Sequence, residues 1–296
     1  MNKKPTPIFV LGKHRSGTTW VREILGNHPD VASVGSESAF FSHVIPKFGP
    51  IETANDFIAF AEAFGASTFF GRTGLSKFDL YRYGPLPLPV FFRRFMDDVA
   101  RKENCQFWLD KTPDHTLHIN RLLHIYKDAR FVGITRDPAE VARSSLKLFH
   151  NKKHLPSVRK RKLFLLRTVF LRQAYNKYLE RARNQSSRVF RIHYEDLLND
   201  TSSTVKGMCD FLNISYHPDM LDTGDANTSF SSERERKQTL SNNEVNWVTS
   251  VNSVLRCLPT AFFDAILAAN ALRRRLSPRP LPHWFYKSKK QELGWD

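Results

Sequence analysis

Short apolar runs alternate along this chain with longer stretches in which apolar residues recur every three or four positions. Five runs predict strands, because each is short and rich in branched or aromatic residues: residues 8–11, 31–34, 106–109, 130–135 and 188–193. Helical spacing is clearest over residues 18–26, 54–64, 90–102, 115–126, 139–149 and 163–182. Alternating strands and helices predict an α/β fold with a parallel β-sheet of about five strands, covered by helices on both faces.

The length of 296 residues suits one large α/β domain, and we expect residues 1–296 to form a single domain. Gly, Pro and aromatic residues interrupt the pattern between residues 69 and 89. Long irregular connections are usually functional or disordered, which leaves open whether this insert walls a binding site or packs on the surface. Residues 273–296 are basic, Pro-rich and aromatic, as expected of a loosely packed C-terminal arm.

The net charge of +16 is unevenly distributed. Residues 150–191 contain thirteen Lys or Arg against the single acid Glu180, a net charge of +12. Such a segment attracts polyanions, whether nucleic acid, acidic lipid, sulfated glycan or acidic peptide, and it also suits peripheral contact with a membrane. The sequence contains no DNA-docking motif, so we predict no specific nucleic-acid partner.

The cysteines and the apolar runs indicate a cytoplasmic protein. Cys105, Cys209 and Cys257 lie far apart without C-x-x-C spacing, so we expect small buried side chains in a reducing compartment. The apolar run at residues 8–11 is too short for a secretory signal. The longest apolar cluster, residues 163–171, is broken by Arg167 and falls well below the ~20 residues of a membrane span.

The first predicted strand runs into a loop with the outline of a phosphate-binding P-loop, G-x-x-x-x-G-K-[ST]. Residues 8–20 read IFVLGKHRSGTTW, with Gly12 and Gly17 five positions apart. Thr18 stands where a nucleoside triphosphatase has its lysine. Successive backbone N–H groups and a helix N-terminus can still bind an anion here, although the missing lysine argues against triphosphate chemistry.

The run GKHRSGTTW resembles the 5′-phosphosulfate loop of sulfotransferases that use 3′-phosphoadenosine 5′-phosphosulfate (PAPS). Taken alone, a Gly-Thr-rich turn could be only a turn. The resemblance implies a parallel-sheet fold of the P-loop type and a loop whose cofactor-binding residues are Lys13, His14, Arg15, Ser16, Gly17, Thr18 and Thr19.

Three later segments extend the resemblance. FVGITRDPAEVARSS resembles the family's 3′-phosphate element, which implies that Arg136 and Ser144 hold that phosphate; alternatively, Arg136 pairs with Asp137 or caps a helix. The run YEDL implies that Tyr194 contacts the adenine or the sugar. Residues 229–237 lie where the family has another phosphate loop, which implicates Ser231 and Arg236, although the R-K-G form is absent. The resemblance covers about residues 8–246.

Sulfuryl transfer needs a base for the acceptor hydroxyl and cations for the charge on the moving group. HPDVASVGSES resembles a segment of protein-tyrosine sulfotransferases, which implies that Glu37 is the catalytic base. In the same branch Lys111, in DKTP, and Arg15 match the catalytic cations. From the residues alone, Glu37 could instead cap a helix and Lys111 could be a solvated side chain.

No metal site is predicted. His115, His118 and His124 fall on one expected helix, but without Cys or carboxylates at ligand spacing. Magnesium is not expected either, because fixed Lys and Arg side chains can stabilise the charge of a transferring sulfuryl group.

The leading interpretation is a PAPS-dependent sulfotransferase that releases 3′-phosphoadenosine 5′-phosphate (PAP). Its acceptor would be a hydroxyl, either of a protein tyrosine or of a carbohydrate or small molecule, and an acidic peptide or glycan would suit the basic segment. Competing interpretations are a P-loop kinase and a non-enzymatic polyanion binder. The sequence does not determine the oligomeric state.

Overall fold

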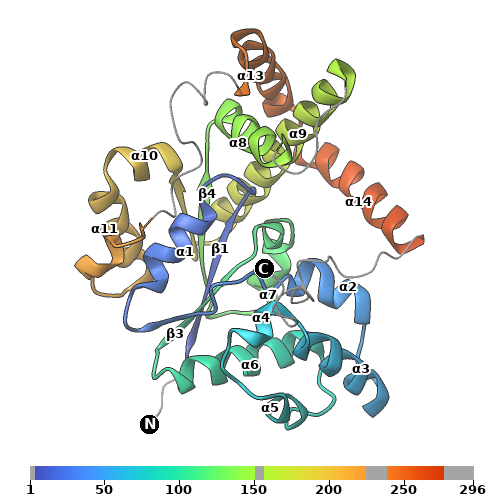
Figure 1. Cartoon of the computed structure of the whole chain (residues 1–296), viewed down its shortest axis with the longest axis vertical. Helices are drawn as coiled ribbons and strands as arrows, with labels where there is room; N and C mark the ends of the chain where they lie inside the picture. Colours follow the sequence, from blue (N-terminus) through green and yellow to red (C-terminus); the bar gives the residue numbers. More distant parts are fainter. Residues whose placement is uncertain (1–3, 151–156, 225–238, 277–296) are drawn as a thin grey trace.

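The computed structural model describes residues 4–150, 157–224 and 239–276. Within these residues, five strands form one parallel sheet in the order β2-β3-β1-β4-β5 (Figure 1). The strands are β1 (Thr6–Gly12), β2 (Val31–Ser33), β3 (Phe107–Lys111), β4 (Arg130–Thr135) and β5 (Val189–His193). All five coincide with the predicted runs, so the predicted parallel sheet is confirmed.

The central strand, β1, has side chains buried on both faces of the sheet. Ile8 and Val10 belong to one hydrophobic core, and Phe9 and Leu11 to another. All four are fully buried. Because successive side chains of a strand point to opposite faces, such a strand requires a cover of helices on both sides.

Helices provide this cover, as predicted. The elements on the face of Ile8 and Val10 are α1 (Thr18–Gly26), α10 (Tyr194–Asn199), α11 (Thr201–Leu212) and the 3₁₀-helix η3 (Pro218–Leu221). The elements on the opposite face are α6 (Leu88–Lys102), α7 (Ile119–Ile125) and the C-terminal part of α9 (Val158–Gln185).

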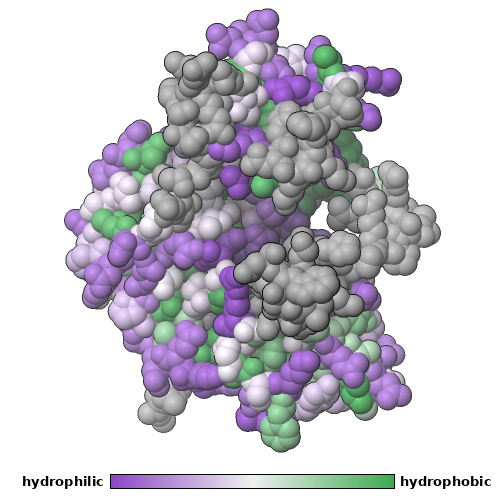
Figure 2. Space-filling model, viewed as in Figure 1, coloured by the Kyte–Doolittle hydropathy of each residue, from purple (hydrophilic) through white to green (hydrophobic). Residues whose placement is uncertain are grey.

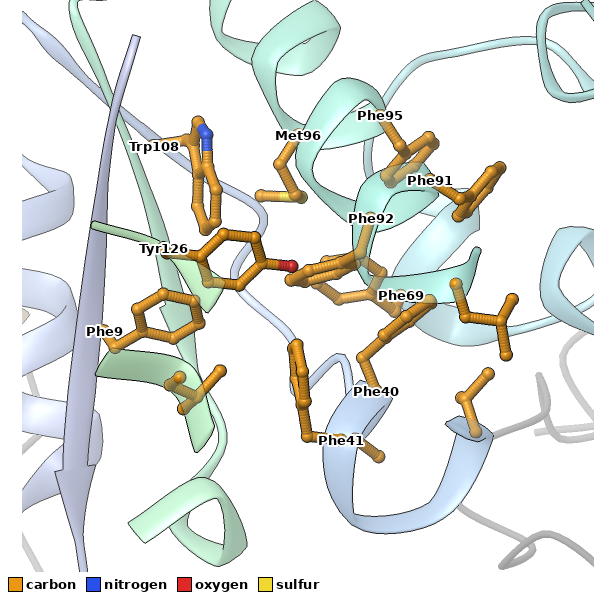
Figure 3. Close-up of a cluster of buried hydrophobic side chains, with 14 of the residues drawn as sticks. Phe9, Phe40, Phe41, Phe69, Phe91, Phe92, Phe95, Met96, Trp108 and Tyr126 are labelled. Carbon is orange, nitrogen blue, oxygen red and sulfur yellow. The ribbon is translucent and has the colours of Figure 1, made fainter. Parts of the chain in front are cut away.

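An aromatic core fills the side of the sheet that carries Phe9. Figure 3 shows the rings of Phe9, Trp108 and Tyr126 facing those of Phe40 and Phe92. The last two stack with their centroids 4.4 Å apart. The elements that complete this side are the π-helix η1 (Phe40–Val44), α2 (Ile45–Phe48), α3 (Ala54–Gly65), α4 (Thr68–Gly71) and α5 (Lys77–Tyr81).

The insert at residues 69–89 contributes to this aromatic core. Phe69 and Phe70, in α4, and Leu80, in α5, are almost completely buried. Serine side chains cap the N-termini of the two short helices. Ser67 is the N-cap of α4, and Ser76 forms a capping box with Asp79 at the start of α5. These side chains pack inside the protein, and only part of the insert lies at the surface.

The helix predicted over residues 115–126 is divided in two. Residues Pro113–His118 form the 3₁₀-helix η2, and α7 begins at Ile119. The hydroxyl of Thr116 donates to the carbonyl of Pro113 at 2.7 Å and accepts the N–H of Gly12 at 2.8 Å. We attribute the tighter first turn to these bonds, which draw η2 towards the end of β1.

A third hydrophobic core joins helices from the C-terminal half of the chain. It lies among α8 (Pro138–His150), the N-terminal part of α9, α13 (Asn242–Cys257) and α14 (Thr260–Leu276). Neither α13 nor α14 was predicted. α14 extends to Leu276, so residues 273–276 of the expected arm are helical, and residues 277–296 lie outside the described residues.

Most of the face seen in Figure 2 is hydrophilic, with hydrophobic side chains in scattered patches. In the described residues, no single helix is long and apolar enough to cross a membrane, although α13 and residues 260–269, bent by 102°, pass that test as a pair. The cysteines are free. Cys209 is buried and Cys105 partly so, but the expected burial of Cys257 is wrong, because it lies on the solvent side of α13.

Candidate active site

The predicted site residues of the described chain gather at one edge of the sheet. Most follow or end a strand: the loop after Gly12 follows β1, Glu37 follows β2, Lys111 ends β3, Arg136 follows β4 and Tyr194 follows β5. Ser144 lies in the helix after Arg136 and contacts the first loop through Arg15. Because all strands run in parallel, their carboxyl ends meet at the same edge. Open α/β sheets bind their ligands at this edge, in the crevice outside the carboxyl ends of the strands.

The loop between β1 and α1 has the backbone of an anion cradle. Gly17 adopts φ 98° and is the N-cap of α1, whose N-terminus receives no side-chain cap in the described structure. Arg15 also has positive φ, at 72°, and the N–H of Ser16 donates to the carbonyl of Lys13 at 3.0 Å. Backbone N–H groups at the start of α1 are therefore left for an anionic ligand.

The predicted loop residues differ in their exposure. Ser16 and Thr18 are buried beneath the loop, whereas Thr19 is exposed in the first turn of α1. Lys13 and His14 lie towards α9, where Lys13 Nζ is 5.7 Å from the centroid of the Tyr175 ring. Burial lowers the pKa of Lys13 from its usual value, and the charge of Asp114 partly offsets this.

Asp114 and Tyr175 are residues of this site that the sequence analysis missed. Asp114 Oδ1 lies 3.2 Å from His14 Nε2 and accepts a hydrogen bond from the hydroxyl of Tyr175. Burial alone would raise the pKa of Asp114, but these two hydrogen bonds and the nearby His43 hold it well below its usual range. Asp114 follows Lys111 by three positions in DKTPD, which was an available signal; Tyr175, on α9, had none.

Arg15, Ser144 and Arg136 meet although they come from three elements. Arg15 Nε donates to Ser144 Oγ at 2.8 Å, and Arg136 donates to the backbone carbonyl of Arg15 at 3.2 Å. Burial lowers the pKa of Arg15, and the charge of Arg136 lowers it further. Two guanidinium groups, from the loops after β1 and β4, and the buried hydroxyl of Ser144 in α8 form a site suited to a phosphate.

The alternative roles considered for Arg136 do not match the geometry. Asp137, not Arg136, caps α8, because its Oδ1 accepts the N–H groups of Ala139 and Glu140 at 2.8 and 3.0 Å. The nearest carboxylate of Arg136 is Glu140, at 3.9 Å. Arg136 Nε is buried and has no hydrogen-bond partner among the described residues. A buried donor without a partner is costly, which favours a ligand at this position.

Tyr194 lies beneath the guanidinium group of Arg136. Arg136 Cζ is 3.8 Å from the centroid of the Tyr194 ring, and the ring also packs edge-on against Trp20. A Cβ atom on Gly17 would lie 2.6 Å from Tyr194 Cδ2. The ring thus supports both the loop and Arg136, and its predicted contact with adenine or sugar stays a prediction.

The two candidate catalytic residues Glu37 and Lys111 form an ion pair. Lys111 Nζ lies 2.7 Å from Glu37 Oε1, with side-chain exposures of 5% and 23%. Lys111 is therefore not a solvated side chain. Glu37 caps none of the described helices; the N-cap residue of the next helix, η1, is Ala39.

The loop that carries Glu37 is fixed by two arginines. Arg22, from α1, and Arg72, after α4, each donate to the carbonyl of Gly35 at 2.8 Å. Gly35 has φ 70°, a left-handed conformation that glycine adopts at little cost. The position of Glu37 thus depends on elements that lie before and after it in the chain.

Two predicted cofactor-binding residues are not described by the structure, and the histidines considered as metal ligands do not form a metal site. Ser231 and Arg236 lie outside the described residues. No group of three or more His, Cys, Asp or Glu in residues 4–150, 157–224 and 239–276 could hold a metal ion. His115 is completely buried between Asp110 and the backbone of Phe41, His118 lies in η2, and His124 is exposed on α7.

A profile described as "Sulfotransferase family" matches residues 7–218 of the chain. This match extends from β1 to the start of η3 and includes every described candidate site residue. A search of curated protein sequences finds no match.

Solved structures that resemble this chain include several sulfotransferases. The sulfotransferase domain of the Synechococcus PCC 7002 olefin synthase is 16% identical, with 95% of this chain and 98% of that one covered and a TM-score of 0.50. The sulfotransferase domain from the curacin biosynthetic pathway is also 16% identical, with 100% and 99% covered and a TM-score of 0.52. A mouse sulfotransferase complexed with PAP is 14% identical, with 90% and 89% covered and a TM-score of 0.44.

Proposed function

The chain belongs to the sulfotransferase family, and from that premise we propose that it transfers the sulfuryl group of PAPS to a hydroxyl acceptor. The observation that carries the proposal is the contact between Glu37 and Lys111 at the edge of the sheet that also holds the loop of residues 12–17. A base, a cation and an anion-binding loop in one place are what sulfuryl transfer requires.

The cofactor would lie along the carboxyl ends of β1 and β4. The backbone of the loop and the N-terminus of α1 would bind the 5′-phosphosulfate. Arg136, with its buried and unpartnered Nε, and Ser144 would bind the 3′-phosphate. Fixed Lys and Arg charges can stabilise the transferring group, so the proposal includes no metal.

In the chemical step, the acceptor oxygen forms a bond to sulfur while the bond between sulfur and the bridging oxygen of PAPS breaks. Glu37 takes the proton of the acceptor hydroxyl. Lys111 and Arg15 stabilise the negative charge that develops on the sulfuryl group and on the bridging oxygen, which leaves with PAP. The low exposure of Lys111 strengthens this effect, because buried charges interact more strongly than solvated ones.

For the acceptor, we propose a protein tyrosine. The match of Glu37, Lys111 and Arg15 to the tyrosine-modifying branch supports this choice, and the basic α9 offers a surface for acidic residues beside the tyrosine. A carbohydrate or a small molecule is the alternative acceptor. The free cysteines suit a reducing compartment, and we propose a cytoplasmic location.

Incubation with PAPS and a mixed panel of tyrosine peptides, glycans and phenols tests the proposal. Mass spectrometry should detect an SO₃ adduct on one acceptor class, and that class identifies the substrate. PAP should raise the melting temperature without added metal, because a ligand that binds only the folded state stabilises it. A shift with ATP and magnesium but none with PAP would instead support a P-loop kinase.

Tight, salt-sensitive binding to oligonucleotides without any turnover of PAPS would support the polyanion-binding alternative.

A further inference from the structure

Four buried polar side chains adjoin the Glu37–Lys111 pair, three as its neighbours in the chain and one, His115, through Asp110. Ser38, Asp110, Thr112 and His115 are all at most 2% exposed. Burial of polar groups costs free energy unless they are hydrogen-bonded to one another or to the backbone. The reaction proposed above uses none of the four, so their placement calls for another role.

These side chains form one connected network around the carboxylate of Asp110. Asp110 accepts hydrogen bonds from Ser38 Oγ at 3.0 Å and from Thr112 Oγ1 at 3.1 Å. His115 Nδ1 lies 2.9 Å from Asp110 Oδ2, close enough for a charge contact but without the geometry of a hydrogen bond. His115 Nε2 accepts the N–H of Phe41 at 3.0 Å, which fixes the orientation of the ring.

The network also holds a strained backbone. Ala39 has φ 51°, an unfavourable conformation for a residue with a Cβ atom, and it is the N-cap of the π-helix η1. The N–H of Ala39 donates to Thr112 Oγ1 at 3.2 Å, and the N–H of Phe40 donates to Ser38 Oγ at 3.3 Å. Strain of this kind persists where the surroundings over-determine it, and it clusters at functional sites.

We propose that Asp110, Thr112 and His115 are positioning residues that hold Glu37 against Lys111, an inference that rests on the proposed function. The network joins the two catalytic residues through their immediate neighbours: Ser38 follows Glu37, and Asp110 and Thr112 flank Lys111. It therefore restricts the backbone on both sides of the pair, and catalytic groups need such restriction to stay in productive geometry.

Thr112→Val tests the proposal, because valine keeps the shape of threonine and removes the hydroxyl that bonds Asp110 and Ala39. We expect kcat to fall tenfold or more on a verified acceptor, with KM and the PAP dissociation constant within about threefold of the wild type. Thr112→Ser, which restores the hydroxyl, should recover most of kcat.

Thr73→Val is a matched control. Thr73 is also buried, and its hydroxyl likewise donates one bond, to the carbonyl of Phe70, and accepts one backbone N–H, from Leu75. These bonds are local to residues 70–75 and involve neither Glu37 nor Lys111, so loss of the hydroxyl should leave kcat unchanged. An equal fall of kcat in both variants would mean general destabilisation and would overturn the proposal.

Hydrogen–deuterium exchange gives a readout that does not depend on turnover. The amides of residues 39–41 should exchange faster in Thr112→Val than in the wild type or in Thr73→Val. If Thr112→Val does not fold, Ser38→Ala removes a different bond to Asp110 and should give the same loss of kcat and the same faster exchange. If the wild type turns over an acceptor but Thr112→Val shows unchanged kcat or unchanged exchange, the positioning role is refuted. If the wild type turns over no acceptor, the proposed function itself is refuted.

Discussion

Lys111 Nζ lies 2.7 Å from Glu37 Oε1, although the two residues are 74 positions apart in the chain. The contact exists because β2 and β3 are neighbours in the sheet and run in parallel. It places a carboxylate beside a largely buried cation at the carboxyl edge of the sheet.

Glu37→Gln should separate binding from chemistry. The amide keeps the volume of the carboxylate but cannot take a proton, so kcat should fall by ~10²–10⁴ while the PAP dissociation constant changes little. Isothermal titration with PAP and turnover at saturating acceptor measure the two effects. Near-normal kcat would show that Glu37 is structural, and His14 or His43 would then be the first bases to examine.

The partner of Glu37 adds a stability test. Glu37→Gln leaves the Lys111 ammonium, which is 5% exposed, opposite a neutral amide, and an uncompensated buried charge is destabilising. Thermal unfolding should therefore show a lower melting temperature for Glu37→Gln, with recovery in Glu37→Gln/Lys111→Met but no recovery of turnover. Lys111→Ala alone should lower kcat more than it lowers PAP affinity. Additive stability losses in the double variant would argue against a direct interaction.

Arg136→Ala should mainly weaken nucleotide binding. The guanidinium group contributes a fork of donors to a phosphate that is present in the ground state and in the transition state alike. We expect at least a tenfold higher PAP dissociation constant. Arg136→Lys is the control, because lysine keeps the positive charge but lacks the forked pair of donors. Its affinity for PAP should lie between those of the wild type and Arg136→Ala. Unaltered PAP binding in Arg136→Ala would exclude a 3′-phosphate contact.

The basic start of α9 should capture an acidic acceptor rather than the nucleotide. Arg159, Lys160 and Lys162 are exposed, whereas Arg161 pairs with Glu244 of α13 at 2.5 Å and should be left intact. Reversal of the three exposed charges to Glu should raise KM for an acidic acceptor and weaken its salt dependence, while PAP affinity holds.

A second triple variant with the same change of net charge shows whether the rise in KM depends on the position of the charges at the start of α9. Lys77 in α5, Arg94 in α6 and Lys127 after α7 are exposed and lie outside residues 150–191, and their reversal to Glu should leave KM nearly unchanged. Steady-state kinetics over a series of salt concentrations measure the difference. Comparable loss of PAP binding in the α9 variant would contradict the division between acceptor and nucleotide sites.

His118 should make stability depend on pH below neutrality. Burial, with a smaller contribution from the charge of Arg121, lowers the pKa of His118 to about 4. Between pH 4 and its ordinary pKa near 6.5, the unfolded chain binds more protons at this residue than the folded chain does. Its contribution is therefore complete above about pH 6.5 and is lost as the pH falls towards 4.

At about 1.4 kcal/mol per pKa unit, this loss amounts to at most about 3.5 kcal/mol of the free energy of unfolding. Urea denaturation at pH 4, 5, 6 and 7 measures it, and His118→Gln should flatten the dependence. His124→Gln, at an exposed position of α7, should not. The same slope in wild type and His118→Gln would show that other groups cause the dependence.

Gly17→Ala should impair both folding and PAP binding. The residue would need φ 98°, and its Cβ would lie 2.6 Å from Tyr194 Cδ2. Gly84→Ala is the matched control, because Gly84 also has positive φ, 61°, but a Cβ there would meet nothing within 4 Å. Gly84→Ala should lower the free energy of unfolding only by the backbone strain, about 1–2 kcal/mol. Gly17→Ala should lower it clearly more. Equal losses in urea denaturation would mean that the contact with Tyr194 is unimportant.

The sequence by itself determined the five strands and the layered α/β fold. An apolar run such as Ile8 to Leu11 predicts a strand that is buried on both faces, because alternate side chains of a strand point to opposite sides of the sheet. The sequence also singled out Glu37, Lys111, Arg15 and Arg136 as candidates one by one, because each belongs to a short motif that resembles one of the family. The helices α13 and α14 were missed, because each buries only a narrow apolar face against α8 and α9.

Only the tertiary structure decided which of these residues touch. Strand order cannot be deduced from local spacing, yet the order β2-β3-β1-β4-β5 brings Glu37 to Lys111 and the loop of β1 to Ser144 and Arg136. Tyr175 and the network around Asp110 have no sequence pattern of their own, and the one local signal for Asp114 was its spacing from Lys111 in DKTPD. Their roles depend on partners up to 100 positions away, as with Asp114 and His14, and such contacts form only when the sheet is assembled.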